Sequence, residues 1–134
     1  MIININPDKE KSKSLIEMAN ITLKRLNELN IMKYPTNSVT DYYDIIHKYL
    51  EALALLNGIK IKGEGAHQEL IDFISKKFSF KEVDRIFLQD MRDLRNRVSY
   101  EGFMIKTEYL DNNLNQINNI INSLDKIARS YLIV

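Results

Sequence analysis

The 134-residue chain contains no cysteine and no tryptophan, and it has only four glycines and two prolines. Without cysteine, disulfide bonds and thiolate metal ligands are excluded, and we predict a cytoplasmic location. Few glycines and prolines indicate long helices joined by short loops. No run approaches the ~18 apolar residues of a membrane span, and residues 1–7 have neither the charged start nor the apolar core of a secretory signal.

A strong charge of either sign is also lacking, because 19 basic residues face 18 acidic ones and the net charge is +1. This balance excludes a general nucleic-acid footprint, so any such binding must come from a local cluster. The hydrophobic fraction of 45% and the charged fraction of 28% are those of a soluble globular protein. The length predicts one domain covering residues 1–134.

Apolar residues recur at spacings of three and four over five segments, which predicts an all-α, up-and-down bundle of about five helices. The expected helices cover about residues 8–30, 40–57, 66–78, 79–101 and 107–131. We expect residues 1–5 to be extended or loosely packed, and residues 33–39 and 59–65 to be connections.

Local signals refine these helices. Asn6 and Pro7 have the form of a helix start, and Ser79 followed by Glu82 has the form of a capping box. The helix over 40–57 is apolar on most of its circumference, so it should be the most buried one or lie between a core and a partner. The inner stripe expected for the first helix is Leu15, Met18, Thr22, Leu26 and Leu29.

The stretch from Asp90 to Gly102 carries the densest group of polar side chains. The spacing predicts one buried face of its helix, made of Val83, Phe87, Met91, Leu94 and Val98. A neighbouring face forms a polar stripe of Arg92, Arg95, Asn96 and Ser99. Gly102 is expected to end the helix as its C-terminal cap.

The run from Arg95 to Gly102, reading RNRVSYEG, resembles the late-helix motif of the HEPN superfamily (higher eukaryotes and prokaryotes nucleotide-binding domains). That signature is Arg, a polar residue that is often Asn, a few variable residues and then His. Arg95 and Asn96 match it, and Tyr100 stands where the His would stand. Residues 42–73 are similar to the second and third helices of these proteins. The resemblance implies a HEPN-like bundle that forms a homodimer.

In HEPN ribonucleases, the family pattern implies metal-independent RNA cleavage at a cleft between two subunits. By this resemblance the catalytic candidates are Arg95, Asn96 and Tyr100, with Arg95 stabilising charge on the phosphate. A phenol titrates near pH ~10, so Tyr100 is a poor base at neutral pH, although it can donate a hydrogen bond. Toxin members of the family carry a modifiable Tyr two residues after the His, and Gly102 holds that place here.

Four other residues could bind RNA or a partner, and some of them also have a structural interpretation. Arg92, Arg97, Ser99 and His47 are candidates for RNA or partner binding. Arg97 is also placed for exposed ion pairs with Asp93 and Glu101.

The two histidines are assigned mainly to structural roles. His47 shares a helix face with Asp44 and Glu51, which favours a surface salt-linked histidine over one that faces a cleft. His67 is assigned a structural or capping role. No spacing of ligands indicates a metal, and no glycine-rich loop indicates a phosphate-bearing cofactor.

Tyr42, Tyr43 and Tyr49 suit base stacking, but at helical spacing in an apolar segment they favour the core.

Three functional hypotheses follow. The first is the HEPN half of a toxin–antitoxin-like pair, which binds RNA or a small nucleotidyltransferase partner. The second is a metal-independent endoribonuclease that uses Arg95 at a dimer cleft. The third is a helical scaffold without a ligand. The homodimer is expected from the resemblance and from the wide apolar surface of the helix over 40–57.

Overall fold

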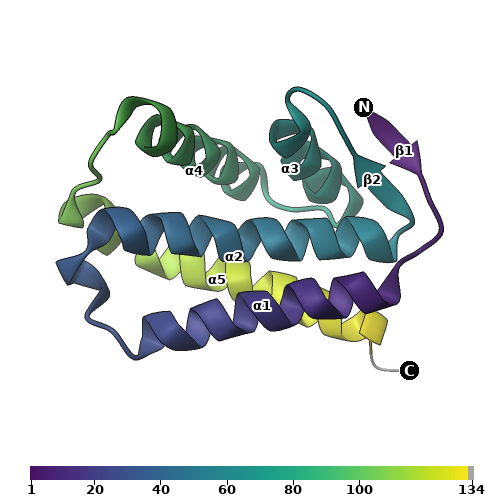
Figure 1. Ribbon diagram of the computed structural model, residues 1–134, viewed down its shortest axis with the longest axis horizontal. Helices are drawn as coiled ribbons and strands as arrows, with labels where there is room; N and C mark the ends of the chain where they lie inside the picture. The colour runs from purple at the N-terminus through teal and green to yellow at the C-terminus, as the bar shows by residue number, and fades with distance from the viewer. Residues whose placement is uncertain (133–134) are drawn as a thin grey trace.

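The computed structural model describes residues 1–132 and confirms an all-α bundle (Figure 1). The predicted domain extends two residues beyond this described part. The five helices are α1 (Lys9–Asn27), α2 (Pro35–Leu56), α3 (Ala66–Lys77), α4 (Glu82–Glu101) and α5 (Thr107–Leu132). The shorter elements are β1 (Ile2–Asn4), the 3-10 helix η1 (Ile31–Lys33) and β2 (Ile59–Ile61). Within residues 1–132, no helix has both the length and the apolar character needed to cross a membrane.

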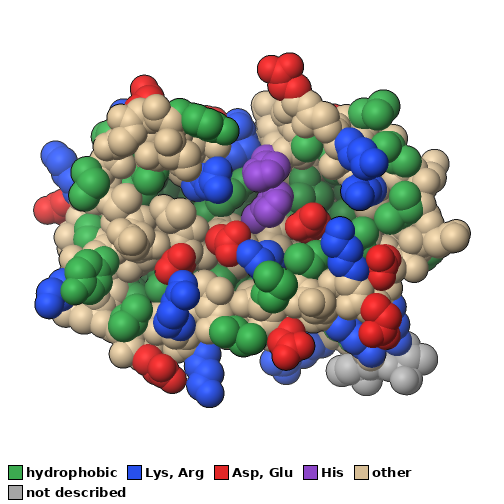
Figure 2. Space-filling model, viewed as in Figure 1, with side chains coloured by type: hydrophobic (Ala, Val, Ile, Leu, Met, Phe, Trp, Pro, Cys, Tyr) green, Lys and Arg blue, Asp and Glu red, His purple; other side chains and the backbone are tan. Residues whose placement is uncertain are grey.

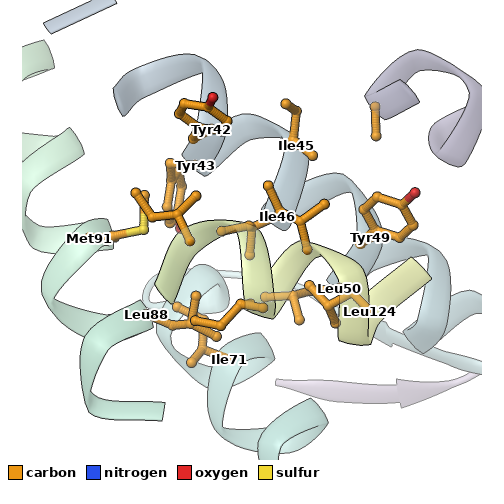
Figure 3. Packing of buried hydrophobic residues seen from close by; sticks show 14 of the residues in the cluster. Tyr42, Tyr43, Ile45, Ile46, Tyr49, Leu50, Ile71, Leu88, Met91 and Leu124 are labelled. Carbon is orange, nitrogen blue, oxygen red and sulfur yellow. The ribbon is translucent and has the colours of Figure 1, made fainter. Parts of the chain in front are cut away.

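Helix α2 is the centre of the molecule, as its apolar circumference predicted. It contacts α1, α3, α4 and α5, and its side chains fill the core drawn in Figure 3. Tyr42, Tyr43 and Tyr49 are all buried, which confirms their assignment to the core. Because the chain itself covers α2, the apolar surface of this helix no longer supports a homodimer.

The chain does not alternate direction at every neighbouring pair of helices. Helices α1 and α2 are antiparallel, as are α4 and α5, but α2 and α5 pack side by side and run in the same direction (Figure 1). The Tyr49 hydroxyl joins three helices at this place. It lies 2.9 Å from the Asn20 side-chain oxygen on α1 and 2.9 Å from an Asp125 carboxylate oxygen on α5.

The bounds and faces of the first two helices differ from the prediction. Helix α2 begins at Pro35, so the loop predicted over 33–39 was wrong, because proline suits the first position of a helix. The cap of α1 is Asp8, whose carboxylate accepts a hydrogen bond from the Lys11 amide, so the Asn6 start was wrong as well. The predicted stripe of α1 includes Met18 and Leu29, which are half-exposed, whereas Ile16 and Ala19 are buried.

Strands β1 and β2 form an antiparallel two-stranded sheet that was not predicted. Ile3 of β1 pairs with Lys60 of β2. Three-residue strands are too short to show a period of two in the sequence. Gly58 makes the turn into β2 with a φ of +69°, and a Cβ there would lie 2.8 Å from the Ile5 carbonyl oxygen.

The start of α4 also differs from the prediction. Lys81 is the residue that precedes the helix, and Ser79 has a φ of +54° and does not cap it, so the capping box was wrong. Val83, predicted to be buried, is 63% exposed, and Leu88 is buried in its place. The end of α4 is as predicted, because Gly102 is its left-handed cap, with a φ of +67°.

Candidate functional site

Helices α3 and α4 pack against each other and against α2. Four residues join the two helices, and near this connection the Arg85 guanidinium on α4 pairs with the Asp72 carboxylate on α3 at 2.9 Å. The Gln89 side chain donates a hydrogen bond to the Gln68 carbonyl further along. Beyond these contacts lies a hollow whose centre holds the two histidines, drawn in purple in Figure 2. We call this hollow the α3–α4 cleft.

Three aromatic rings are stacked in a column at the cleft. The His47 ring on α2 and the His67 ring on α3 have centroids 4.1 Å apart and planes inclined by 27°. Tyr43 lies one turn before His47 on α2, and its ring also stacks with that of His47, with centroids 6.1 Å apart. The prediction of a surface salt-linked His47 was therefore wrong, and the neighbouring Asp44 carboxylate pairs with Lys48 instead.

The surroundings of the rings lower the pKa of both imidazoles. Burial, and then the neighbouring His67, lower the pKa of His47 to about 4, so His47 is neutral at neutral pH. His67 is more exposed, and partial burial and then the charge of Arg95 lower its pKa too. The His47 Nδ1 atom and the Tyr43 hydroxyl are buried and have no hydrogen-bond partner among residues 1–132. Burial raises the pKa of Tyr43 to about 12, so its phenol stays protonated.

Two arginines of the predicted polar stripe lie near this column. The charges of Arg92 and Arg95 both lower the pKa of Tyr43 and of His67, so both guanidiniums lie within electrostatic reach of the rings. Arg92 is held by the Asp93 carboxylate at 2.8 Å and the Gln89 side-chain oxygen at 3.0 Å. Arg95 is half-buried and makes no ion pair with any residue in the range 1–132. Its charge is therefore available to an anion in the cleft.

The remaining candidates on α4 differ in burial and in their contacts. Tyr100 is 83% exposed, and Ser99 is exposed too. The Arg97 guanidinium pairs with the Glu101 carboxylate at 3.3 Å and lies 4.0 Å above the Phe103 ring, which agrees with its structural interpretation. Asn96 is half-buried beside Arg95.

The predicted site residues therefore fall into two groups. Arg92 and Arg95 are half-buried near the histidines, whereas Tyr100 is exposed to solvent. His67 also lies in the cleft, stacked on His47, although we predicted a structural or capping role for it. It does not cap α3, because the residue that precedes this helix is Gly65. A helical wheel places residues only within one helix, so no sequence signal paired His67 with His47.

Neither known proteins nor a group of metal ligands identifies this site. Neither the family models, nor the curated proteins, nor the solved structures contain a match to this chain. Among residues 1–132, no three carboxylate or imidazole side chains are grouped so that they could hold a metal ion.

Proposed function

We propose that this protein is a HEPN-like domain that binds RNA through the α3–α4 cleft. The observation that carries the proposal is Arg95, a guanidinium without an ionic partner in the described chain, beside two imidazoles whose pKa values are lowered. A guanidinium offers paired, planar donors that match the oxygens of a phosphate. Neutral imidazoles add hydrogen-bonding groups and stacking faces, and neither repels an anion.

A comparison of two arginines on the same helix tests this proposal. Arg95 is half-buried and close enough to the histidines for its charge to lower both pKa values, whereas Arg97 is exposed and paired with Glu101. We expect Arg95→Ala to weaken binding of single-stranded, mixed-sequence RNA by about 10- to 100-fold, since a charged hydrogen bond contributes ~1.5–3 kcal/mol. Fluorescence anisotropy at several salt concentrations measures both the affinity and its salt dependence, whose slope should fall by about 0.7 for each lost phosphate contact.

Arg97→Ala is the control, because it removes the same charge from the same helix outside the cleft. It should change the affinity less than about threefold, as expected for a screened surface charge. Equal losses for the two variants would mean that RNA is held by diffuse charge rather than by the cleft. The absence of RNA binding by the parent protein would contradict the proposal itself.

A second candidate, metal-independent RNA cleavage, is favoured by the histidines beside Arg95. In such a reaction an imidazole takes the proton of the RNA 2′-hydroxyl while the 2′-oxygen bonds to the adjacent phosphorus. The bond to the 5′-oxygen breaks as that oxygen takes a proton from solvent, and Arg95 stabilises the charge on the phosphate. The exposed Tyr100 is not needed for this step. Separation of the RNA products in EDTA, with the same two arginine variants, distinguishes cleavage from binding.

The resemblance also supports a partner, so we propose that the protein acts as the HEPN half of a toxin–antitoxin-like pair. The partner would be a small nucleotidyltransferase, and the protein itself would be a homodimer. The surface that supports association is the outer side of α4, where Val83, Ile86 and Tyr100 are exposed. Light scattering of the purified protein measures the dimer, for which we expect twice the monomer mass. Capture from the native cell tests the nucleotidyltransferase.

A further inference from the structure

A pocket of about 140 Å³ opens beside the histidines, on the side of the cleft away from α4. The His47 and His67 side chains line one part of it, and α1, α2, β2 and α3 supply the rest. A cavity of about 150 Å³ is known to hold one benzene molecule, so this volume encloses one six-membered ring, and the second ring of a purine would lie at the opening. The sugar and phosphate of a bound nucleotide would remain outside, close to the cleft.

The walls of this pocket are suited to a flat, polar-edged ring. Leu55, Ile59 and Leu70 supply apolar surface, and the two imidazoles supply aromatic surface. Two exposed cations, Lys11 on α1 and Lys60 on β2, also line the pocket. Together they make an apolar slot with positive charge near its opening, which is the arrangement that a nucleobase with its phosphate requires.

Glu51 is the acidic side chain in the lining of this pocket. It is half-buried on α2, its charge is close enough to raise the pKa of His67, and it forms no ion pair within residues 1–132. A carboxylate accepts hydrogen bonds and donates none. It therefore favours a ring edge with two adjacent N–H donors.

We propose that this pocket binds the guanine base of an RNA nucleotide and that the Glu51 carboxylate recognises its Watson–Crick edge. Among the four RNA bases, guanine alone presents two neighbouring donors, its N1–H and its N2 amino group, to one carboxylate. Adenine and cytosine present an amino group beside a ring nitrogen that accepts, and uracil presents one N–H between two carbonyls. In each of these three bases, an acceptor atom would face one of the carboxylate oxygens, and two acceptors cannot form a hydrogen bond with each other.

The inference rests on the proposed RNA binding for its class of ligand, but mononucleotides test it separately. Isothermal titration or NMR shift mapping with GMP, AMP, CMP and UMP measures the base preference directly. We expect GMP to bind about tenfold or more tightly than the others. Glu51→Gln should remove most of this preference, because an amide offers only one acceptor oxygen and opposes one guanine donor with its own N–H.

Glu64→Gln is the matched control, since Glu64 is exposed in the turn before α3 and does not line the pocket. It should bind GMP as the parent protein does. Equal binding of the four mononucleotides, or an unchanged preference in Glu51→Gln, would overturn the guanine pocket.

The remaining outcomes separate the two proposals. Failure of all four mononucleotides to bind, with RNA still bound through Arg95, would overturn the pocket and leave the proposed function in place. Selective GMP binding without RNA binding would support the pocket and contradict the proposed function.

Discussion

Leu50→Ala is expected to lower the free energy of unfolding by about 3–5 kcal/mol. Leu50 lies in the second half of α2, is 1% exposed and packs in the core with Leu124 of α5 (Figure 3). Truncation removes apolar surface from the core and leaves a cavity that the surrounding helices fill only in part. A loss of this size is a large share of the ~5–15 kcal/mol that stabilises an ordinary domain. Urea unfolding followed by circular dichroism measures it, with an unchanged m value.

Leu29→Ala is the control for this experiment, because it is the same substitution at a leucine that is 51% exposed. Its cost should stay below about 1 kcal/mol. The sequence pattern placed Leu29 on the inner stripe of the first helix, whereas α1 ends at Asn27, so this variant also tests the observed exposure of Leu29. Similar losses for the two variants would show that the core is not centred on α2.

Acid is expected to destabilise the protein through His47, by about 3 kcal/mol between pH 6.5 and pH 4. The pKa of His47 is lowered from 6.5 to about 4 in the folded protein, because burial opposes its charged form. In this window the unfolded chain binds a proton that the folded chain does not, so stability falls as the pH falls. Each pKa unit between the folded and the unfolded chain corresponds to about 1.36 kcal/mol, and this loss of stability is complete below about pH 4.

The measurement is the free energy of unfolding in urea at pH 7 and pH 4.5, for the parent and for His47→Gln. The variant lacks the titrating ring, so its stability should fall less over the same range. The charged and titratable groups that surround His47 are unchanged in the variant: Tyr43, Asp44, Lys48, Glu51, His67, Arg92 and Arg95. An equal fall for the two proteins would assign the acid sensitivity to these other groups.

The sequence predicted the helices well where apolar residues recur over several turns. Helix α5 buries Leu110, Ile117, Ile121 and Leu124, which recur along the sequence at spacings of three, four and seven. The prediction failed at short elements and at helix starts. Three-residue strands are below the length at which a period is visible, and Pro35 is equally compatible with a loop and with the first turn of a helix.

The candidate site was predicted only in part, because its residues come from three helices. Spacing within α4 correctly brought Arg92 and Arg95 to one side, and it also added Ser99, which is exposed. The resemblance gave weight to Tyr100, but this residue is 83% exposed. Burial depends on what the neighbouring helices cover, and a single helix pattern contains no such information.

The sequence by itself determined the all-α class, the central place of α2 and the clustering of arginines on α4, since these follow from composition and from periodicity along one helix. The tertiary structure alone decided that α3 folds back beside α4 and brings His67 onto His47. It also decided that Glu51 lines a pocket and that Arg95 lies beside the imidazoles. Contacts between residues 20 or more positions apart depend on how whole helices pack, so they exist only in the folded molecule.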